Sequence, residues 1–422
     1  MKTIFQITWF CVVSFLIFMC CSTPLRSHFI QAQDIEQLPN SYEDINTDPN
    51  NRKRIDPLAY APDTSHLDHT PMKYIRMNFH FMNSTDSKNN LTGDAARKFA
   101  KDMINTANRN MAKNRKMLLP TGNNTPVLPL QFKFVISPNP NIPGNDGIYF
   151  HQDDDLYYYI HRGRNRNRHK RKVINKYGVQ LDTVLNVFIM PHHPDSLASS
   201  TYKAYDVGIA LRNALKINGN IKTKKGSFFA TILSHEVGHI LGLSHAWLRH
   251  DGCDDTPTHK NDCLNRSAPG CEGRTSNNVM DYNIYQKAWT PCQIGKIHAK
   301  IARETSIQRK FIEPLWCESK ESKHIRITDT IFWDIEKDLE GPLTIESGGS
   351  LRVSQRLSMP IGSKITIQAG GTLILDNVKI HNSCGHTWQG IEIQELGSKK
   401  GKLQEIGDCQ VEDTVHPYPN TQ

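Results

Sequence analysis

The chain has 422 residues, 38% of them hydrophobic, so it is long enough for two or three domains and too apolar to be disordered throughout. Its formal net charge of +9 would suggest a nucleic-acid or membrane partner if the charges were spread evenly. Seven positive charges lie in one stretch, RGRNRNRHKRK at 162–172, and removing them leaves 9 − 7 = +2. No aromatic residues alternate with these charges, as stacking on nucleic-acid bases would require. We interpret the stretch as a solvated surface loop, with a patch for a polyanionic glycan or nucleic acid as the alternative.

Residues 1–32 are expected to be a signal peptide. Lys2 precedes an apolar run at 4–19, which polar residues interrupt and which is marginal in length for a membrane-spanning helix. Cleavage is expected at the end of this segment or earlier, near Ser22. We therefore expect a secreted or cell-surface protein of bacterial-type export, with no stable membrane span after signal removal. The residue before Cys20 argues against a lipoprotein anchor.

Residues 33–72 are polar and rich in proline and asparagine, and are expected to form a prosegment or a linker. The following region, 73–313, alternates between strand and helix patterns, which predicts an α+β domain. The strands are expected at 73–82, 131–137 and 185–191, and the helices at 94–116 and 226–243.

The character of the sequence changes after about residue 317. LTIESGGSLRV (343–353) and ITIQAGGTLIL (365–375) align without a gap at an offset of 22 residues, each with two short strands joined at a Gly-Gly corner. The repeat predicts an all-β solenoid over 318–422, similar to the opening rungs of right-handed parallel β-helices, with WQGIEIQ (388–394) as a later rung. An ordinary β-sandwich is the alternative. An unfinished solenoid would leave an open sheet edge that needs a cap or a partner.

The stretch SHEVGHILGLSHAW has the residue pattern of a zinc site. His235 and His239 are four residues apart, so their imidazoles leave one face of a helix and can share a metal ion. The glycine three residues on lets the chain leave the helix, and His245 supplies a third nitrogen. Three neutral histidines leave a fourth position open on Zn²⁺, as in catalytic sites. Glu236 can reach the zinc-bound water and act as general base and acid.

Four cysteines follow this motif, and in an exported chain they are expected to form two disulfides, in any of three pairings. They are Cys253, Cys263, Cys271 and Cys292.

The extended motif HExxHxxGxxH resembles that of the metzincins, in which a methionine-containing turn follows some tens of residues later. SNNVMDY at 276–282 fits this turn. The resemblance implies a catalytic domain with a mixed sheet and an active-site helix. It also implies that Met280 forms an apolar floor beneath the histidines, and that Tyr282 lies near the zinc and stabilises the oxyanion.

The segments RHDGCDDTPTHKNDC and TPCQIGKIH make the sequence resemble one family of metzincins, the pappalysins, including their bacterial cytophagalysin-type members. The resemblance implies the disulfides Cys253–Cys271 and Cys263–Cys292. It also implies a Ca²⁺ site near these loops, for which the candidate ligands are Asp254, Asp255 and Asp262.

These features predict a secreted zinc-dependent endopeptidase that hydrolyses peptide bonds in proteins or peptides. The alternative is a surface adhesion or glycan-binding protein that contacts glycans or cells through the solenoid and keeps a vestigial protease domain. Nucleic acid is not an expected partner. Residues 33–72 contain no cysteine that could hold the zinc in a latent form, so latency would require an acidic residue such as Asp68, or steric cover.

Overall fold

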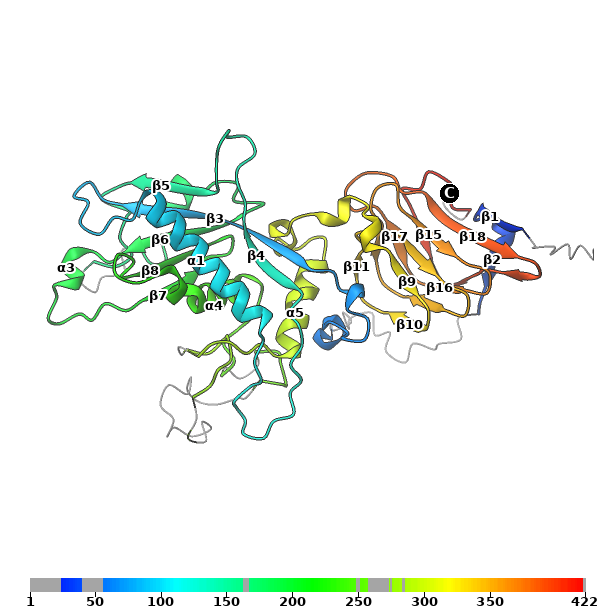
Figure 1. Ribbon diagram of the computed structural model, residues 1–422, viewed down its shortest axis with the longest axis horizontal. Coiled ribbons are helices and arrows are strands. Elements are labelled where there is room, and N and C mark those ends of the chain that lie inside the picture. Colours follow the sequence, from blue (N-terminus) through cyan, green and yellow to red (C-terminus); the bar gives the residue numbers. More distant parts are fainter. Residues whose placement is uncertain are drawn as a thin grey trace, which may run out of the picture.

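The computed structural model describes most of the chain, namely residues 24–39, 56–161, 167–247, 251–256, 273, 275–282 and 285–419. The predicted apolar run at 4–19 lies outside the described residues. An α+β domain and a C-terminal region of parallel sheets follow each other along the long axis of the molecule (Figure 1). Among the described residues, no helix is both long and apolar enough to span a membrane.

The α+β domain is built on a six-stranded sheet with the order β4-β3-β6-β8-β7, in which β5 also pairs with β3. All neighbours are parallel except β7, which runs antiparallel to β8 at the sheet edge. The three predicted strands are confirmed as β3, β4 and β6. The bounds are β3 (Lys73–Asn83), β4 (Phe132–Ile136), β5 (Ile148–Gln152), β6 (Leu185–Pro191), β7 (Val207–Ala210) and β8 (Ala214–Gly219).

Both faces of this sheet are covered, which explains why all seven residues of β6 are buried and all but Asn186 are apolar. Alternate residues such as Val187 and Ile189 face a core shared with α1 and α4, whereas Phe188 and Met190 face a second cluster that includes Tyr159. Helix α1 buries residues at spacings of three and four, and ends four residues before the predicted boundary. The helices are α1 (Gly93–Ala112), α2 (Lys172–Tyr177), α3 (Pro194–Leu197), α4 (Ala230–Ile240) and α5 (Pro291–Ala302).

The C-terminal region contains three sheets with the orders β1-β18-β15-β12-β9, β10-β13-β16-β20-β2 and β11-β14-β17-β21, and β19 pairs with β18. Leu343 lies beside Ile365 and Leu351 beside Leu373, so the 22-residue repeat sets the register of neighbouring strands. Strand β18, which contains most of WQGIEIQ, continues the first sheet in parallel with β15. Parallel neighbours contradict the β-sandwich alternative, whose sheets are antiparallel.

The strands of this region are short, and their inward residues are mostly leucine and isoleucine. The bounds are β9 (Ile325–Ile327), β10 (Thr330–Trp333), β11 (Lys337–Asp338), β12 (Leu343–Ile345), β13 (Ser350–Val353), β14 (Leu357–Ser358), β15 (Lys364–Ile367), β16 (Thr372–Asp376), β17 (Lys379–His381), β18 (Gly390–Leu396), β19 (Lys399–Lys400), β20 (Lys402–Ile406) and β21 (Gln410–Val411).

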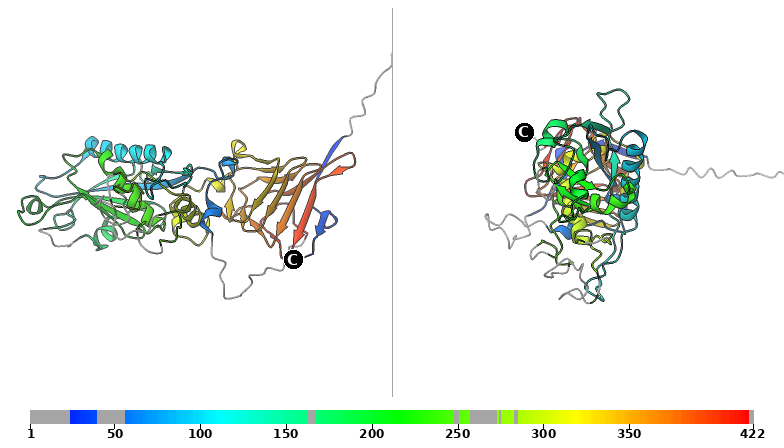
Figure 2. Two further views of the ribbon diagram at one scale, coloured as in Figure 1. Left: turned by 90° about the horizontal axis from the view of Figure 1, so that it is seen from below. Right: turned by 90° about the vertical axis from the view of Figure 1, so that its left-hand side faces the viewer.

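The N-terminal segment covers the edges of two of these sheets. Strand β1 (Leu25–Phe29) pairs antiparallel with β18, and β2 (Ile35–Gln37) pairs parallel with β20. Both lie at the end of the molecule farthest from the α+β domain (Figure 2). Asp34 attaches the segment to the sheets through Lys400 at 2.5 Å, and its contact with His28 of β1 at 3.0 Å lies within the segment. Because β1 falls inside the range expected for the signal peptide, only the earlier of the two cleavage sites leaves this strand in the chain.

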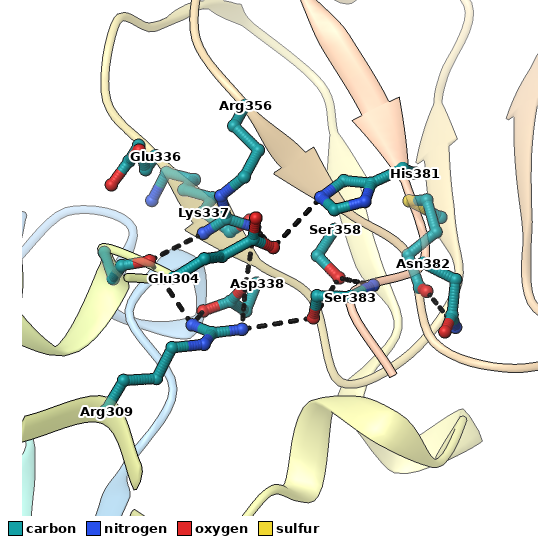
Figure 3. Close-up of polar contacts among 12 residues, drawn as sticks. Glu304, Arg309, Glu336, Lys337, Asp338, Arg356, Ser358, His381, Asn382 and Ser383 are labelled. Carbon is teal, nitrogen blue, oxygen red and sulfur yellow. Dashed lines mark hydrogen bonds and ion pairs between the residues drawn. The ribbon is translucent and has the colours of Figure 1, made fainter. Parts of the chain in front are cut away.

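The two regions meet at a polar contact that we call the junction cluster: Glu304, Arg309, Asp338, Arg356 and His381 (Figure 3). Asp338 accepts from Arg309 Nη2 at 2.9 Å and from Arg356 Nη1 at 2.7 Å. Glu304 pairs with Arg356 at 3.5 Å and with His381 at 3.0 Å. Arg309 and Glu304 come from the α+β domain and the others from the sheets, so charges hold the two regions together.

Two further links cross the junction. Cys317 and Cys384 form a disulfide with a sequence separation of 67 that the sequence analysis did not anticipate. Lys73, at the start of β3, pairs with Glu340 at 3.1 Å, and both side chains are buried. The sheet region is therefore attached to the α+β domain by covalent, ionic and packing contacts.

Candidate active site

Helix α4 presents His235 and His239 on one face, and His245 reaches the same point after the chain turns at Gly242, whose φ of +96° suits glycine. The Nε2 atom of His239 lies 3.1 Å from Nε2 of both His235 and His245. The Nδ1 atoms point away from this centre: that of His235 donates to Val279 O at 2.8 Å and that of His239 to Leu243 O at 2.9 Å.

These contacts fit a zinc ion. A carbonyl only accepts, so the Nδ1 atoms of His235 and His239 carry the protons and their Nε2 lone pairs point inward. Burial lowers the pKa of His235 to about 3, which keeps this ring neutral. Two neutral Nε2 atoms cannot hydrogen-bond to each other, but a cation bound between them would satisfy both lone pairs. Ligands about 2.0–2.1 Å from one tetrahedral zinc are about 3.4 Å apart, close to the spacing found here.

The predicted methionine turn lies directly beneath this helix. Met280 is fully buried, and a Cβ added at Gly238 would lie 2.5 Å from its Sδ atom. Asn278 shapes the turn, because its Oδ1 accepts from Met280 N at 2.8 Å and its amide pairs with Gln293 of α5. The structure therefore places Met280 under the histidine-bearing helix, where the resemblance implied it should be.

Tyr282 lies beside the histidines and remains 48% exposed. Its ring centroid is 4.6 Å from that of His245 and 5.6 Å from that of His235. The ring of Trp247 stacks on that of His245, with the two centroids 4.2 Å apart. Its centroid also lies 4.5 Å from that of Tyr282. The sequence analysis did not single out Trp247, although its place two residues after the last histidine is a usable signal.

Glu236 is buried beside the edge strand β7. A Cβ at Gly208 would lie 2.4 Å from Cγ of Glu236, so glycine is needed there for the carboxylate to fit. Burial raises the pKa of Glu236 to about 7, while the backbone N–H of Ala210 and the charge of Arg168 act to lower it. The carboxylate thus lies in an environment that favours taking up a proton.

The histidines and Glu236 lie in an open cleft of about 1360 Å³. One wall is the edge strand β7 with Tyr205 and Asp206. Another includes Phe228, two residues before α4, and Tyr282 of the methionine turn. Arg168 also lines the cleft. It belongs to the basic stretch that we interpreted as a surface loop, so this interpretation is wrong for Arg168; Arg162, Arg164 and Arg166 lie outside the described residues.

The implied disulfide pairing is wrong. Cys253 bonds to Cys292, with a Cα–Cα distance of 5.5 Å, rather than to Cys271. The reason is that the loop after the third histidine folds onto the first turn of α5, where Asp255 accepts from Cys292 N at 2.9 Å and fixes the approach. Cys263 and Cys271 lie outside the described residues.

The calcium candidates gain no support. Asp254 is exposed, and Asp255 makes the contact to α5 just described. The cysteines grouped with Asp255 form a disulfide and have no thiolate to offer a metal. Asp262 lies outside the described residues. Asp68, considered as a latency residue, is exposed on a short turn at Leu67–His69, and no described residue of 33–72 lines the cleft.

The fold and the three-histidine cluster define a metzincin-like α+β domain. The Peptidase_M43 family model, described as pregnancy-associated plasma protein-A, matches residues 169–302. The chain therefore contains a Peptidase M43, or pappalysin, family domain, which confirms the resemblance seen in the sequence. No curated protein matches the chain.

Solved structures of Tannerella forsythia mirolysin are similar to part of this chain. The mature enzyme in complex with a cleaved peptide has 16% identity and a TM-score of 0.40, covering 57% of this chain and 95% of its own. A promirolysin variant has 15% identity and a TM-score of 0.40, covering 57% and 84%. Mirolysin in complex with compound 9 has 16% identity and a TM-score of 0.38, covering 57% and 96%.

Proposed function

We propose that the protein is a zinc-dependent endopeptidase that hydrolyses peptide bonds in proteins or peptides. The observation that carries this proposal is the convergence of three imidazole Nε2 atoms beside the buried carboxylate of Glu236, in an open cleft. A site built only for structure would close the fourth position of the metal, whereas here a cleft leads to it.

His235, His239 and His245 would hold the zinc. When bound, the zinc activates water and polarises the scissile carbonyl. Glu236 takes a proton from the attacking water and passes it to the leaving amine, a role that its raised pKa suits. Tyr282, exposed next to the histidines, donates a hydrogen bond to the developing oxyanion.

The edge strand β7 accounts for how an extended substrate would bind. It pairs only with β8 among the described strands, so its outer edge offers backbone groups to a second chain along the cleft wall. An added strand makes main-chain hydrogen bonds that do not depend on sequence, as a general endopeptidase requires.

The experiment is to measure zinc content and hydrolysis of a denatured protein mixture for the wild type and for Glu236→Gln. We expect the variant to keep its zinc and to lose about 10²–10⁴-fold in rate, the usual contribution of a general base. Glu313→Gln, at a residue that does not line the cleft, is the matched control. Near-normal proteolysis by Glu236→Gln, or hydrolysis that persists after a chelator removes the zinc, would rule the proposal out.

We further propose that the C-terminal sheets form a β-solenoid, right-handed as expected for parallel crossovers. Each successive set of three strands, such as β9-β10-β11 and then β12-β13-β14, contributes one strand to each sheet. The competing function, adhesion or glycan binding through this region, would be favoured by polysaccharide binding of the whole protein without any hydrolysis.

Export to the cell surface or medium is also part of the proposal. It is supported by the disulfides Cys253–Cys292 and Cys317–Cys384, which persist in oxidising compartments. Mapping the N-terminus of the exported protein tests it: a start near residue 22 retains β1, and a start after residue 32 removes it.

A further inference from the structure

The basic stretch brings one of its arginines into the cleft on an anchored loop. Lys216 of β8 is fully buried, and its ammonium donates to the backbone carbonyls of Asn167, Arg168 and Lys170. The side chain of Asn167 donates to two more carbonyls, those of Asp155 at 3.0 Å and Tyr158 at 2.8 Å. A buried lysine used in this way fixes the backbone on both sides of Arg168, so the arginine is presented from a rigid support.

The side chain of Arg168 is half-buried and lines the cleft. Its charge lowers the pKa of Tyr159 against the raising effect of burial. Arg168 thus lines the same cleft as the general base Glu236, and the fully buried Tyr159 is its neighbour.

The guanidinium of Arg168 has no carboxylate partner among the described residues. Its neighbour is the hydroxyl of Tyr159, a neutral group that leaves the positive charge of Arg168 without a counter-charge. Two other charged residues line the cleft outside the catalytic site, and neither resembles Arg168. Asp206 is paired with Lys224, and Lys287 is exposed to solvent. A guanidinium that lines a cleft without a counter-charge is available to an anionic group of a ligand.

We propose that Arg168 is a specificity-determining residue that binds an acidic side chain, aspartate or glutamate, of the substrate next to the scissile bond. A guanidinium pairs with a carboxylate through two parallel hydrogen bonds, which neither a glutamine nor a lysine of the substrate can match. This inference rests on the proposed endopeptidase function and assigns one chemical preference to its cleft.

The test uses peptides in which Glu, Gln and Lys in turn occupy each of the three positions on either side of the cleaved bond. The wild type should cleave the Glu peptide about 10- to 100-fold faster in kcat/KM than the Gln peptide at one position, the range for a hydrogen bond to a charged group. Arg168→Gln should remove this ratio, Arg168→Lys should reduce it, and Arg168→Glu should shift the preference to the Lys peptide. Lys287→Gln removes a positive charge from the same cleft and should keep the ratio.

A second measurement tests the role of Arg168 in peptide binding without any hydrolysis. Zinc-loaded Glu236→Gln, with and without Arg168→Gln, is titrated with fluorescent Glu and Gln peptides, and their affinities are compared by anisotropy. Tighter binding of the Glu peptide that disappears with Arg168→Gln supports the proposal even if no peptide is hydrolysed, in which case only the proposed function fails. The proposal would be overturned if the wild type showed equal kcat/KM for Glu and Gln peptides and the zinc-loaded Glu236→Gln protein bound both equally well. A preference for Glu that survives Arg168→Gln would also overturn it.

Discussion

The cleft and the junction cluster both remove arginine side chains from solvent, but they treat the charge differently. At the junction, Arg309 and Arg356 share Asp338, and Arg356 also reaches Glu304 (Figure 3). In the cleft, Arg168 has no such partner among the described residues. An arginine that is neutralised within the chain stabilises the fold, whereas one left unmatched in a concave site is available to a ligand.

The same contrast holds for histidine. His381 at the junction pairs with Glu304 at 3.0 Å, so it has a carboxylate within the protein. In the cleft, three imidazoles converge through their Nε2 atoms, an arrangement that a metal cation would satisfy. The chain thus uses arginine and histidine to attach its two regions at the junction, and uses the same two residue types for chemistry in the cleft.

Replacing Asp338 gives the sharpest test of this contrast. Asp338→Asn leaves two buried guanidinium groups facing a neutral amide, and we expect a loss of about 3–5 kcal/mol in the free energy of unfolding. Arg168→Gln is the matched change in the cleft, with an expected loss within about 1 kcal/mol. Denaturant unfolding of both variants measures the difference. Comparable losses for the two variants would show that the cleft arginine is structural after all.

Removing the disulfide across the junction is expected to cause the next largest loss of stability. Replacing both Cys317 and Cys384 with serine opens a loop of 67 residues, and we expect about 2–4 kcal/mol less stability. Because the junction cluster and the Lys73–Glu340 pair still join the two regions, zinc content should stay unchanged. Thermal unfolding of the double variant, against the wild type under the same oxidising conditions, checks this. A loss of zinc without a loss of stability would mean that the junction acts on the cleft.

A smaller effect is expected at the contact between α4 and the methionine turn. Gly238→Ala places a methyl group 2.5 Å from the sulfur of Met280, and overpacking of this kind typically costs about 1–3 kcal/mol. Met280→Ala in the same chain frees that space, so the two substitutions should not be additive. A double-mutant cycle on zinc affinity and stability measures the coupling. Full additivity would show that the two residues do not press on each other.

Much of the site could be predicted because it depends on local spacing. His235 and His239 share a helix face at any i, i+4 position, and the 22-residue repeat fixes which strands become neighbours. The missed features depend on contacts distant in sequence. Cys253 pairs with Cys292 because a loop folds back on α5, and Arg168 enters the cleft because Lys216 of another strand holds its loop. Strand β1 pairs with β18 at the opposite end of the chain, which no local pattern reveals.

The smallest expected effect concerns acid. His298 of α5 is buried and donates to Leu130 O at 2.8 Å, and burial lowers its pKa to about 4. The unfolded chain therefore binds this proton first, so stability falls as the pH drops from about 6.5 towards about 4. Between pH 7 and 5.5 this one group should cost about 1 kcal/mol. Gln at position 298 keeps a donor but does not titrate, so His298→Gln should flatten the pH dependence of the unfolding free energy by that amount. An unchanged slope would mean that His298 takes up its proton at the same pH in the folded and the unfolded protein, so that burial in this core does not shift its pKa.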